Sequence, residues 1–178
     1  IPGNNEVLIY QNIAFNFNEW NTISGVFKND SIILYHNGII VYQSLQSGFG
    51  TLQQNNYQTF LGKYRAANAQ YFFDGKIDNI EIWEIGLSQD QIQQYISCPP
   101  TGNEPGLVGY WNFEEGSGTI AADLTSNGNN GTLVNGPTWS TDVPNQVCIS
   151  CNATDTVVIT ELLSTNSFIT ETACLPFL

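Results

Sequence analysis

Apolar and polar positions alternate through the first hundred residues, and short turns rich in glycine and asparagine interrupt them. This two-residue period is typical of β-strands. The clearest case lies at 31–42, where two β-branched and aromatic runs flank Asn37 and Gly38. Because Asn-Gly readily adopts the positive φ angles of a type I′ turn, this segment is predicted to be a β-hairpin.

Further strands are predicted on both sides of that hairpin, at 20–27, 59–62, 71–83, 106–113, 119–124 and 132–134. The 20–27 strand carries apolar residues on both faces, which predicts a central position in its sheet. The 71–83 strand is interrupted at Asp74 and Gly75, a pair typical of turns. Residues 43–57 are polar and show no period, so they are predicted to form a loop.

One helix is predicted, from Ser88 to about Ile96. Ser88 is a favourable N-cap, and Gln91, three residues later, completes a capping box. Pro99 and Pro100 follow the helix and end it, because proline cannot continue helical hydrogen bonding.

The composition indicates a folded domain with few charges. Hydrophobic residues make up 42% of the chain and aromatic residues 12%, which is enough for a core. Charged residues make up only 11%, against roughly 25% in typical soluble domains. Asparagine, glutamine, serine, threonine and glycine therefore supply most of the polar surface.

The charge that is present is strongly acidic, with sixteen acidic residues, four basic ones and a net charge of −12. The basic residues are Lys28, Lys63, Arg65 and Lys76. Nucleic acids and anionic membranes attract clustered cations, so neither is an expected partner. Bound cations or neutral glycans fit this charge better. No run approaches the ~18 apolar residues of a membrane-spanning helix, so membrane insertion is not expected either.

Four cysteines are candidates for disulfide bonds, with three pairings open if all are bridged: Cys98, Cys148, Cys151 and Cys174. The Cys148–Cys151 spacing also suits half of a zinc knuckle or a redox pair. A zinc site needs two more close ligands, and the only histidine, His36, lies far away in the sequence. No βαβ pattern surrounds the pair, which disfavours a redox motif. Disulfides are therefore favoured, as in extracellular proteins.

A succession of motifs occupies 20–96: Leu34-Tyr-His-Asn-Gly38, Leu61-Gly62, Phe73-Asp-Gly-Lys-Ile-Asp-Asn-Ile-Glu-Ile-Trp83 and the capped segment Leu87–Ile92. This order resembles the closing half of a domain of the laminin-G-like/concanavalin-A-like lectin superfamily, in its bacterial surface-protein and pentraxin-related branch. A second succession, from Gly106 to Trp139, is similar to the opening of the same domain.

The resemblance implies an all-β fold, an antiparallel β-sandwich of the jelly-roll, concanavalin-A-like kind, with one short helix near 88–96. It divides the chain into a closing half at 1–98, a linker at 99–105, opening-type strands at 106–144 and a cysteine-containing tail at 145–178. The 106–144 strands either fold back and complete the first sandwich or begin a next repeat. We favour folding back, because it covers open strand edges and a lone half-sandwich is rarely stable.

The chain contains no methionine. We therefore expect that Ile1 is not a translation start and that the chain is part of a longer, multidomain protein.

Glycosidases share the implied fold, and the laminarinase type carries acids at alternate positions of one strand. Here Asp78, Glu81 and Glu84 are spaced by three. Odd spacings in a regular strand place neighbours on opposite faces, so we expect these carboxylates to diverge. A retaining pair needs carboxyl groups about 5 Å apart. No catalytic residue is therefore assigned, and the chain is not expected to be an enzyme.

The resemblance also raises the question of calcium, because pentraxins carry an acidic cluster that corresponds to the residues from Lys63 onward. These residues are basic or apolar here, so that site is absent. Asp123, Asn127 and Asn129 instead offer oxygen ligands in a tight loop and are candidate calcium ligands. The alternative is that these three residues only form turns.

Aromatic side chains near loops are candidates for stacking against sugar rings: Tyr64, Tyr71 and Trp139. Arg65 lies beside Tyr64, where a cation and an aromatic residue cluster in an otherwise acidic chain. The resemblance implies a non-catalytic recognition or adhesion module of a larger, secreted bacterial surface protein. Its ligand at the cell surface would be a glycan or a protein. The alternatives are a structural spacer or export-associated segment, and an accessory carbohydrate-binding module of a polysaccharide-degrading enzyme.

Overall fold

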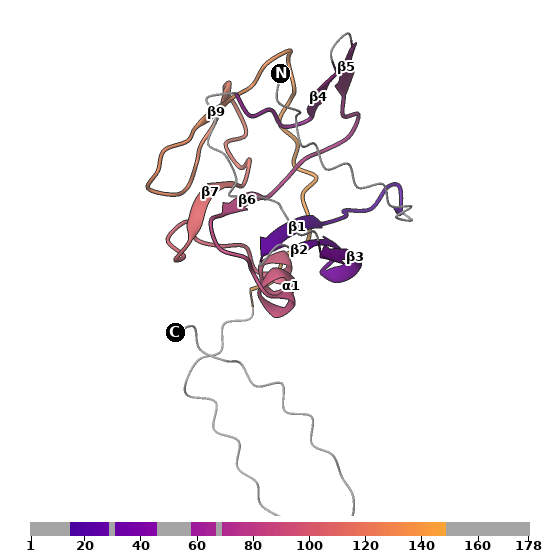
Figure 1. The fold of residues 1–178 in the computed structure, drawn as a ribbon. Coiled ribbons are helices and arrows are strands. Elements are labelled where there is room, and N and C mark those ends of the chain that lie inside the picture. Colours follow the sequence, from indigo (N-terminus) through magenta and orange to yellow (C-terminus); the bar gives the residue numbers. More distant parts are fainter. Residues whose placement is uncertain (1–14, 29–30, 46–57, 67–68, 149–178) are drawn as a thin grey trace, which may run out of the picture.

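The computed structural model describes residues 15–28, 31–45, 58–66 and 69–148. These residues form short antiparallel strands and one short helix (Figure 1). The elements in chain order are β1 (Ile23–Lys28), β2 (Ser31–His36), β3 (Ile39–Leu45), β4 (Lys63–Ala66), β5 (Ala69–Phe72), β6 (Ile80–Trp83), α1 (Gln89–Ser97), β7 (Leu107–Trp111), β8 (Ile120–Ala121) and β9 (Gly131–Thr132). The expected all-β, antiparallel fold with one helix is confirmed for this part of the chain.

β1, β2 and β3 form a three-stranded antiparallel sheet in that order. Asn37 and Gly38 have φ angles of 50° and 72° in the β2–β3 turn, so the predicted hairpin is confirmed. Among the described residues β2 is the central strand and β1 pairs on one side only, so the central position predicted for 20–27 is not seen in this part of the chain. The burial explains the order, because β1 buries only Val26 whereas no residue of β2 is exposed.

The helix α1 begins and ends close to its predicted bounds. The Ser88 hydroxyl accepts the Gln91 backbone N–H, and the Gln91 side-chain carbonyl accepts the Ser88 backbone N–H at 2.8 Å, so the capping box is confirmed. A buried cluster of Val26, Tyr35 and Ile92 joins the helix to the three-stranded sheet. Within the described residues, no helix is long and apolar enough to cross a membrane.

The second hairpin begins later than predicted. The strand predicted at 59–62 is wrong, because these residues are irregular and the strand β4 begins only at Lys63. Gly62 has a φ of 71°, in the left-handed region that a β-strand does not use. The turn at Gly62 therefore delays the strand and directs β4 into antiparallel pairing with β5.

The long strand predicted at 71–83 is two separate strands with an irregular segment between them. β5 ends at Phe72, and β6 begins at Ile80. The interruption expected at Asp74 and Gly75 is real but extends to Asn79, whose φ is 48°. A residue in this left-handed conformation cannot continue the extended chain, so β6 starts directly after it.

β7 pairs antiparallel with β6, with Glu81 opposite Tyr110. β6 belongs to the first of the two family-like stretches, and β7 belongs to the second. Strands from both stretches therefore share one sheet, which is the contact that folding back requires. The four-part division of the chain stays a prediction.

A disulfide bond joins Cys98, at the end of α1, to Cys148, with a sequence separation of 50. This bond occupies the first thiol of the Cys148–Cys151 pair, so Cys148 is neither a free zinc ligand nor a free redox thiol. Cys151 and Cys174 lie outside the described residues.

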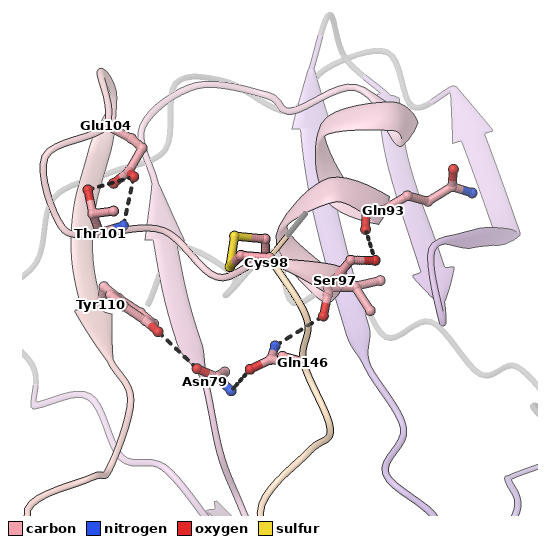
Figure 2. The surroundings of a disulfide bond; sticks show 10 residues. Asn79, Gln93, Ser97, Cys98, Thr101, Glu104, Tyr110 and Gln146 are labelled. Carbon is pink, nitrogen blue, oxygen red and sulfur yellow. Dashed lines mark hydrogen bonds between the residues drawn. A yellow bond between two sulfur atoms is a disulfide. The ribbon is translucent and has the colours of Figure 1, made fainter. Parts of the chain in front are cut away.

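A chain of hydrogen bonds runs beside the disulfide and connects four segments (Figure 2). The Tyr110 hydroxyl donates to Asn79 Oδ1, Asn79 Nδ2 donates to Gln146 Oε1, and Gln146 Nε2 donates to the Ile96 carbonyl, each at 3.0 Å. β7, the segment before β6, the segment before Cys148 and α1 are thus held together by polar contacts as well as by the covalent bond.

Candidate functional site

The β4–β5 hairpin brings together three of the four residues nominated as ligand contacts. Tyr64 lies opposite Tyr71, and Arg65 lies opposite Gln70 in the strand register. The side chains of Tyr64 and Arg65 lie outside the described part of the structure, whereas Tyr71 is exposed. The hairpin lies at the end of the molecule away from α1 (Figure 1).

Large apolar side chains are exposed around this hairpin, with exposed fractions from 37% to 60%. We call them the hairpin patch: Phe60, Leu61, Tyr71, Phe72, Phe73 and Ile77. The two halves of the patch meet at Gly62, whose carbonyl accepts the Phe73 N–H at 2.9 Å. A Cβ atom at Gly62 would lie 3.3 Å from Ile77 Cδ1. Two segments that are separate in sequence therefore lie side by side at Gly62.

A positive charge lies within this surface. The Lys63 ammonium is 5.0 Å from the centroid of the Phe60 ring, a distance typical of a cation–π contact. Lys63 also lies opposite Phe72 in the register. The hairpin patch thus combines exposed aromatic rings with a cation.

The sequence analysis nominated Tyr71 but missed its apolar neighbours. Tyr71, Phe72 and Phe73 are three consecutive aromatic residues. Successive residues of a strand point to opposite faces, so three in a row cannot all be buried under a core on one side. This run was the signal for an exposed aromatic surface.

The fourth nominated ligand residue, Trp139, lies outside the hairpin patch. Its indole N–H donates to the Gly118 carbonyl at 3.0 Å, and its side chain is half-buried. This contact joins the segment after β9 to the turn before β8. Trp139 therefore contributes to local packing, and no described contact links it to Tyr71.

Asp123, the centre of the nominated calcium loop, is a buried carboxylate with 8% of its surface exposed. Its Oδ1 accepts the backbone N–H groups of Tyr110 at 3.1 Å and Thr125 at 2.9 Å, and its Oδ2 accepts that of Asn129 at 2.8 Å. Burial alone would raise the pKa of Asp123, but these N–H donors outweigh it and lower the pKa.

The same loop covers the outer edge of β7. The Asn127 and Asn129 side-chain amides donate to the Val108 carbonyl at 2.9 and 3.2 Å, and the Leu124 N–H donates to the Tyr110 carbonyl at 2.8 Å. With the Tyr110 N–H bound to Asp123, the strand groups that face away from β6 have partners. The loop therefore closes an edge that is otherwise free to pair with another strand.

This arrangement gives Asp123, Asn127 and Asn129 a structural use, which corresponds to the turn-forming alternative for the loop. Among the described residues, no group of three or more histidine, cysteine or acidic side chains is placed to hold a metal ion. Calcium binding at this loop stays a prediction.

The strand alternation assumed for the acidic residues of the β6 region does not extend to all of them. Asp78 precedes the left-handed Asn79, so the alternation argument applied to Asp78 and Glu81 does not hold there. Burial is the largest cause of a raised pKa at Tyr110, and the charges of Glu81 and Asp78 add to it. Together they raise the pKa of Tyr110 to about 12. Glu84 lies beyond the end of β6 and is exposed.

Burial raises the pKa of both Asp78 and Glu81. Glu81 Oε2 accepts the Trp83 indole N–H at 3.0 Å, and this hydrogen bond lowers the pKa of Glu81 in part. The charge of Glu104 raises the pKa of Glu81 further. The Trp83 ring in turn packs against Tyr95 with centroids 4.8 Å apart. These contacts hold Glu81 in a half-buried, aromatic environment.

Comparison with known proteins finds one family whose model matches the first half of the chain. The family model described as the concanavalin A-like lectin/glucanases superfamily matches residues 3–93, just over half of the chain. The matched range includes the hairpin patch, β6 and the first turn of α1. No curated protein and no solved structure matches the chain.

Proposed function

We propose that this chain, which belongs to the concanavalin A-like lectin/glucanases superfamily, is a non-catalytic recognition module of a larger, secreted bacterial surface protein. It binds a glycan or a protein ligand at the cell surface, and the β4–β5 hairpin is the contact surface. Membership of a superfamily that includes lectins supports a binding role, although a fold alone does not name the ligand.

The exposed aromatic surface of the hairpin patch is the observation that carries this proposal. Tyr71, Phe72 and Phe73 are each more than half exposed. Exposed apolar groups of this size cost free energy in water, so several of them on one hairpin support a surface that another molecule covers. A structural spacer would have no need of such a surface.

The experiment is a glycan array probed with the folded chain in the presence of calcium, beside the Tyr71→Ala variant. We expect binding to at least one glycan class, with a loss of about tenfold or more in the variant. Val134→Ala is the matched control, because Val134 is 66% exposed and lies outside the hairpin patch. Binding that the Tyr71 substitution leaves unchanged would exclude the hairpin as the contact surface for glycans.

The non-catalytic part of the proposal has a separate test. The half-buried Glu81, with its raised pKa, is the carboxyl group in the described residues that most resembles a general acid. We expect no release of reducing ends from soluble β-glucans by the chain. Hydrolysis that disappears in Glu81→Gln would overturn the proposal and identify the chain as a glucanase.

A further inference from the structure

Four Asn-Gly pairs occur in the sequence, and all of them lie in the part of the chain that the structure describes: 37–38, 127–128, 130–131 and 135–136. An asparagine before a glycine is open to spontaneous deamidation, because glycine has no Cβ atom to hinder attack by its backbone nitrogen on the asparagine side chain. The attack needs a side-chain amide that can turn toward that nitrogen. The four pairs therefore differ in reactivity to the extent that the fold holds their side chains.

The first pair is held inside the β2–β3 hairpin. Asn37 Oδ1 accepts the Thr22 N–H at 2.8 Å, and the Asn37 N–H donates to the Thr22 carbonyl at 2.8 Å. Gly38 is buried, and its carbonyl accepts Gln93 Nε2 from α1 at 3.1 Å. The Asn37 amide therefore cannot turn toward the Gly38 nitrogen without breaking its contact with Thr22.

The next two pairs belong to the loop that covers β7. Asn127 Nδ2 donates to the Val108 carbonyl at 2.9 Å, and Asn130 Oδ1 accepts the Asp123 N–H at 2.9 Å. Gly131, which follows Asn130, is also part of β9. Both asparagines are exposed to solvent, yet both amides are held by the main chain of another segment. Exposure alone therefore does not make these side chains free to react.

Asn135 differs from the other three asparagines. Its side chain is exposed, and no described residue forms a hydrogen bond with it. A Cβ atom at Gly136 would have nothing within 4 Å, so the space beside the attacking nitrogen is open. The pair forms a turn in which Asn135 and Gly136 have φ angles of 64° and 75°. Asn135 is thus the one Asn-Gly asparagine of this chain whose amide is free to rotate.

We propose that Asn135 is a site of spontaneous deamidation in the folded chain, and that it reacts before the other three because the fold holds their amides. The Gly136 nitrogen attacks Asn135 Cγ, the Cγ–Nδ2 bond breaks, and Nδ2 leaves as ammonia with the proton from the Gly136 nitrogen. Water then opens the resulting succinimide ring. Opening at Cγ gives aspartate, whereas opening at the main-chain carbonyl gives isoaspartate. Nothing is oxidised or reduced, and water is the only co-reactant.

The products change the turn between two contacts with one segment. The Leu133 N–H donates to the Thr119 carbonyl at 2.9 Å, and the Trp139 indole N–H donates to the Gly118 carbonyl at 3.0 Å. Isoaspartate adds a carbon atom to the main chain between these contacts. Both products add a negative charge to a chain that already carries −12. The protein therefore becomes heterogeneous in charge as it ages, at a position outside the hairpin patch.

The test incubates the full, oxidised chain at mildly alkaline pH and follows each Asn-Gly asparagine by peptide mapping with mass spectrometry. We expect Asn135 to convert about fivefold faster than each of the others, or more, because those must first lose a hydrogen bond. The same incubation in concentrated guanidinium chloride removes the fold. There we expect the lead of Asn135 to disappear.

A variant locates the product independently of the rates. Isoaspartate is measured in the aged, folded chain by enzymatic methylation with a labelled methyl donor. Asn135→Gln is expected to remove most of the early label, because the longer side chain closes a ring much more slowly. Asn145→Gln is the matched control and is expected to keep the label, since Asn145 is also exposed but precedes Gln146.

Two results would overturn the proposal. The first is conversion of Asn37, Asn127 or Asn130 in the folded chain at the rate of Asn135. The second is a lead of Asn135 that persists in guanidinium chloride, because the local sequence and not the fold would then be its cause. Equal labelling of the aged parent chain and the aged Asn135→Gln variant would place the reaction elsewhere and contradict the assignment.

Discussion

A single carboxylate, Asp123, organises the loop that covers β7. It accepts three backbone N–H groups from positions 110, 125 and 129, and its own N–H donates to Asn130 Oδ1 at 2.9 Å. Asparagine and glycine residues around it were read from the sequence as turn formers or calcium ligands. The side-chain amides of Asn127 and Asn129 donate to the edge of a strand, a use that depends on a tertiary contact with Val108.

Replacing Asp123 with alanine leaves three backbone donors without this partner, and the N–H groups of Tyr110 and Thr125 are buried. Each buried donor that loses its partner costs roughly 1–3 kcal/mol, so we expect Asp123→Ala to lower the free energy of unfolding by about 3 kcal/mol or more. Urea denaturation followed by tryptophan fluorescence measures this. Asp142→Asn serves as the comparison and is expected to leave the midpoint nearly unchanged, since its ion pair with Lys76 is exposed.

Gly102 shows how closely the segment after the helix approaches the Asp123 loop. A Cβ atom there would lie 2.3 Å from the Leu124 carbonyl oxygen, and the φ of Gly102 is 99°. We expect Gly102→Ala to destabilise the chain by roughly 3 kcal/mol or more, because backbone cannot move aside cheaply. Gly116→Ala has a similar positive φ but nothing within 4 Å of the added atom, so about 1 kcal/mol is expected. Equal melting temperatures for the two variants would contradict the predicted contact.

Glu81 gives the stability of the chain a pH dependence whose sign follows from its raised pKa. The folded state binds this proton more tightly than the unfolded state does. The contribution to stability is therefore complete below the usual glutamate pKa and is lost as the pH rises through the higher pKa of the folded state. Asp123, whose pKa is lowered, has the opposite effect and loses its contribution as the pH falls.

We expect Glu81→Gln to be more stable than the parent chain at pH 7, with the difference shrinking as the pH falls toward 4. The glutamine side-chain oxygen can still accept the Trp83 N–H, so the substitution removes mainly the buried charge. Free energies of unfolding measured from pH 4 to 8 give the comparison. A difference that stays constant with pH would show that the Glu81 charge is not the cause.

At the scale of elements, the sequence predicted correctly the hairpin and the helix start, which depend on neighbouring residues alone. The Asn37-Gly38 hairpin and the Ser88 capping box depend on residues a few positions apart, and both are confirmed. The strand boundaries at 59–62 and 71–83 were wrong, because Gly62 and Asn79 adopt left-handed conformations that the alternating pattern does not reveal.

The candidate site was predictable only in part for a similar reason. The sequence pointed to Tyr64, Arg65 and Tyr71, and the strand register places them on one hairpin. It gave no indication that Phe60 joins them, since that contact depends on the turn at Gly62 and on the approach of Lys63 to the ring. Trp139 looked equivalent in the sequence, but it is held at Gly118 by a contact between distant segments.

At the scale of the whole molecule, the disulfide links the end of the family-like region to residue 148. The Cys98–Cys148 bond closes a loop with a separation of 50 residues that contains β7, β8 and β9. In the chain-entropy model a loop of this length is worth about 4 kcal/mol, because the bond restricts the unfolded chain.

We therefore expect the Cys98→Ala, Cys148→Ala double variant to lose about 4 kcal/mol of stability. Differential scanning calorimetry of the variant and of the oxidised parent chain measures the loss. Reduction of the parent chain with dithiothreitol is expected to give the same result as the double variant. If the double variant unfolds at the same temperature as the oxidised parent chain, the 99–147 loop is held by its non-covalent contacts alone.

The same bond has a mechanical consequence. If the chain is pulled from its two ends, the load passes from Cys98 to Cys148 through the sulfur atoms and bypasses the residues between them. At roughly 3.3–3.6 Å per extended residue, about 170 Å of chain between the two cysteines cannot extend until the bond is reduced. The oxidised module is therefore a shorter tether than its sequence length suggests, and its extensibility under load depends on the redox state of its surroundings.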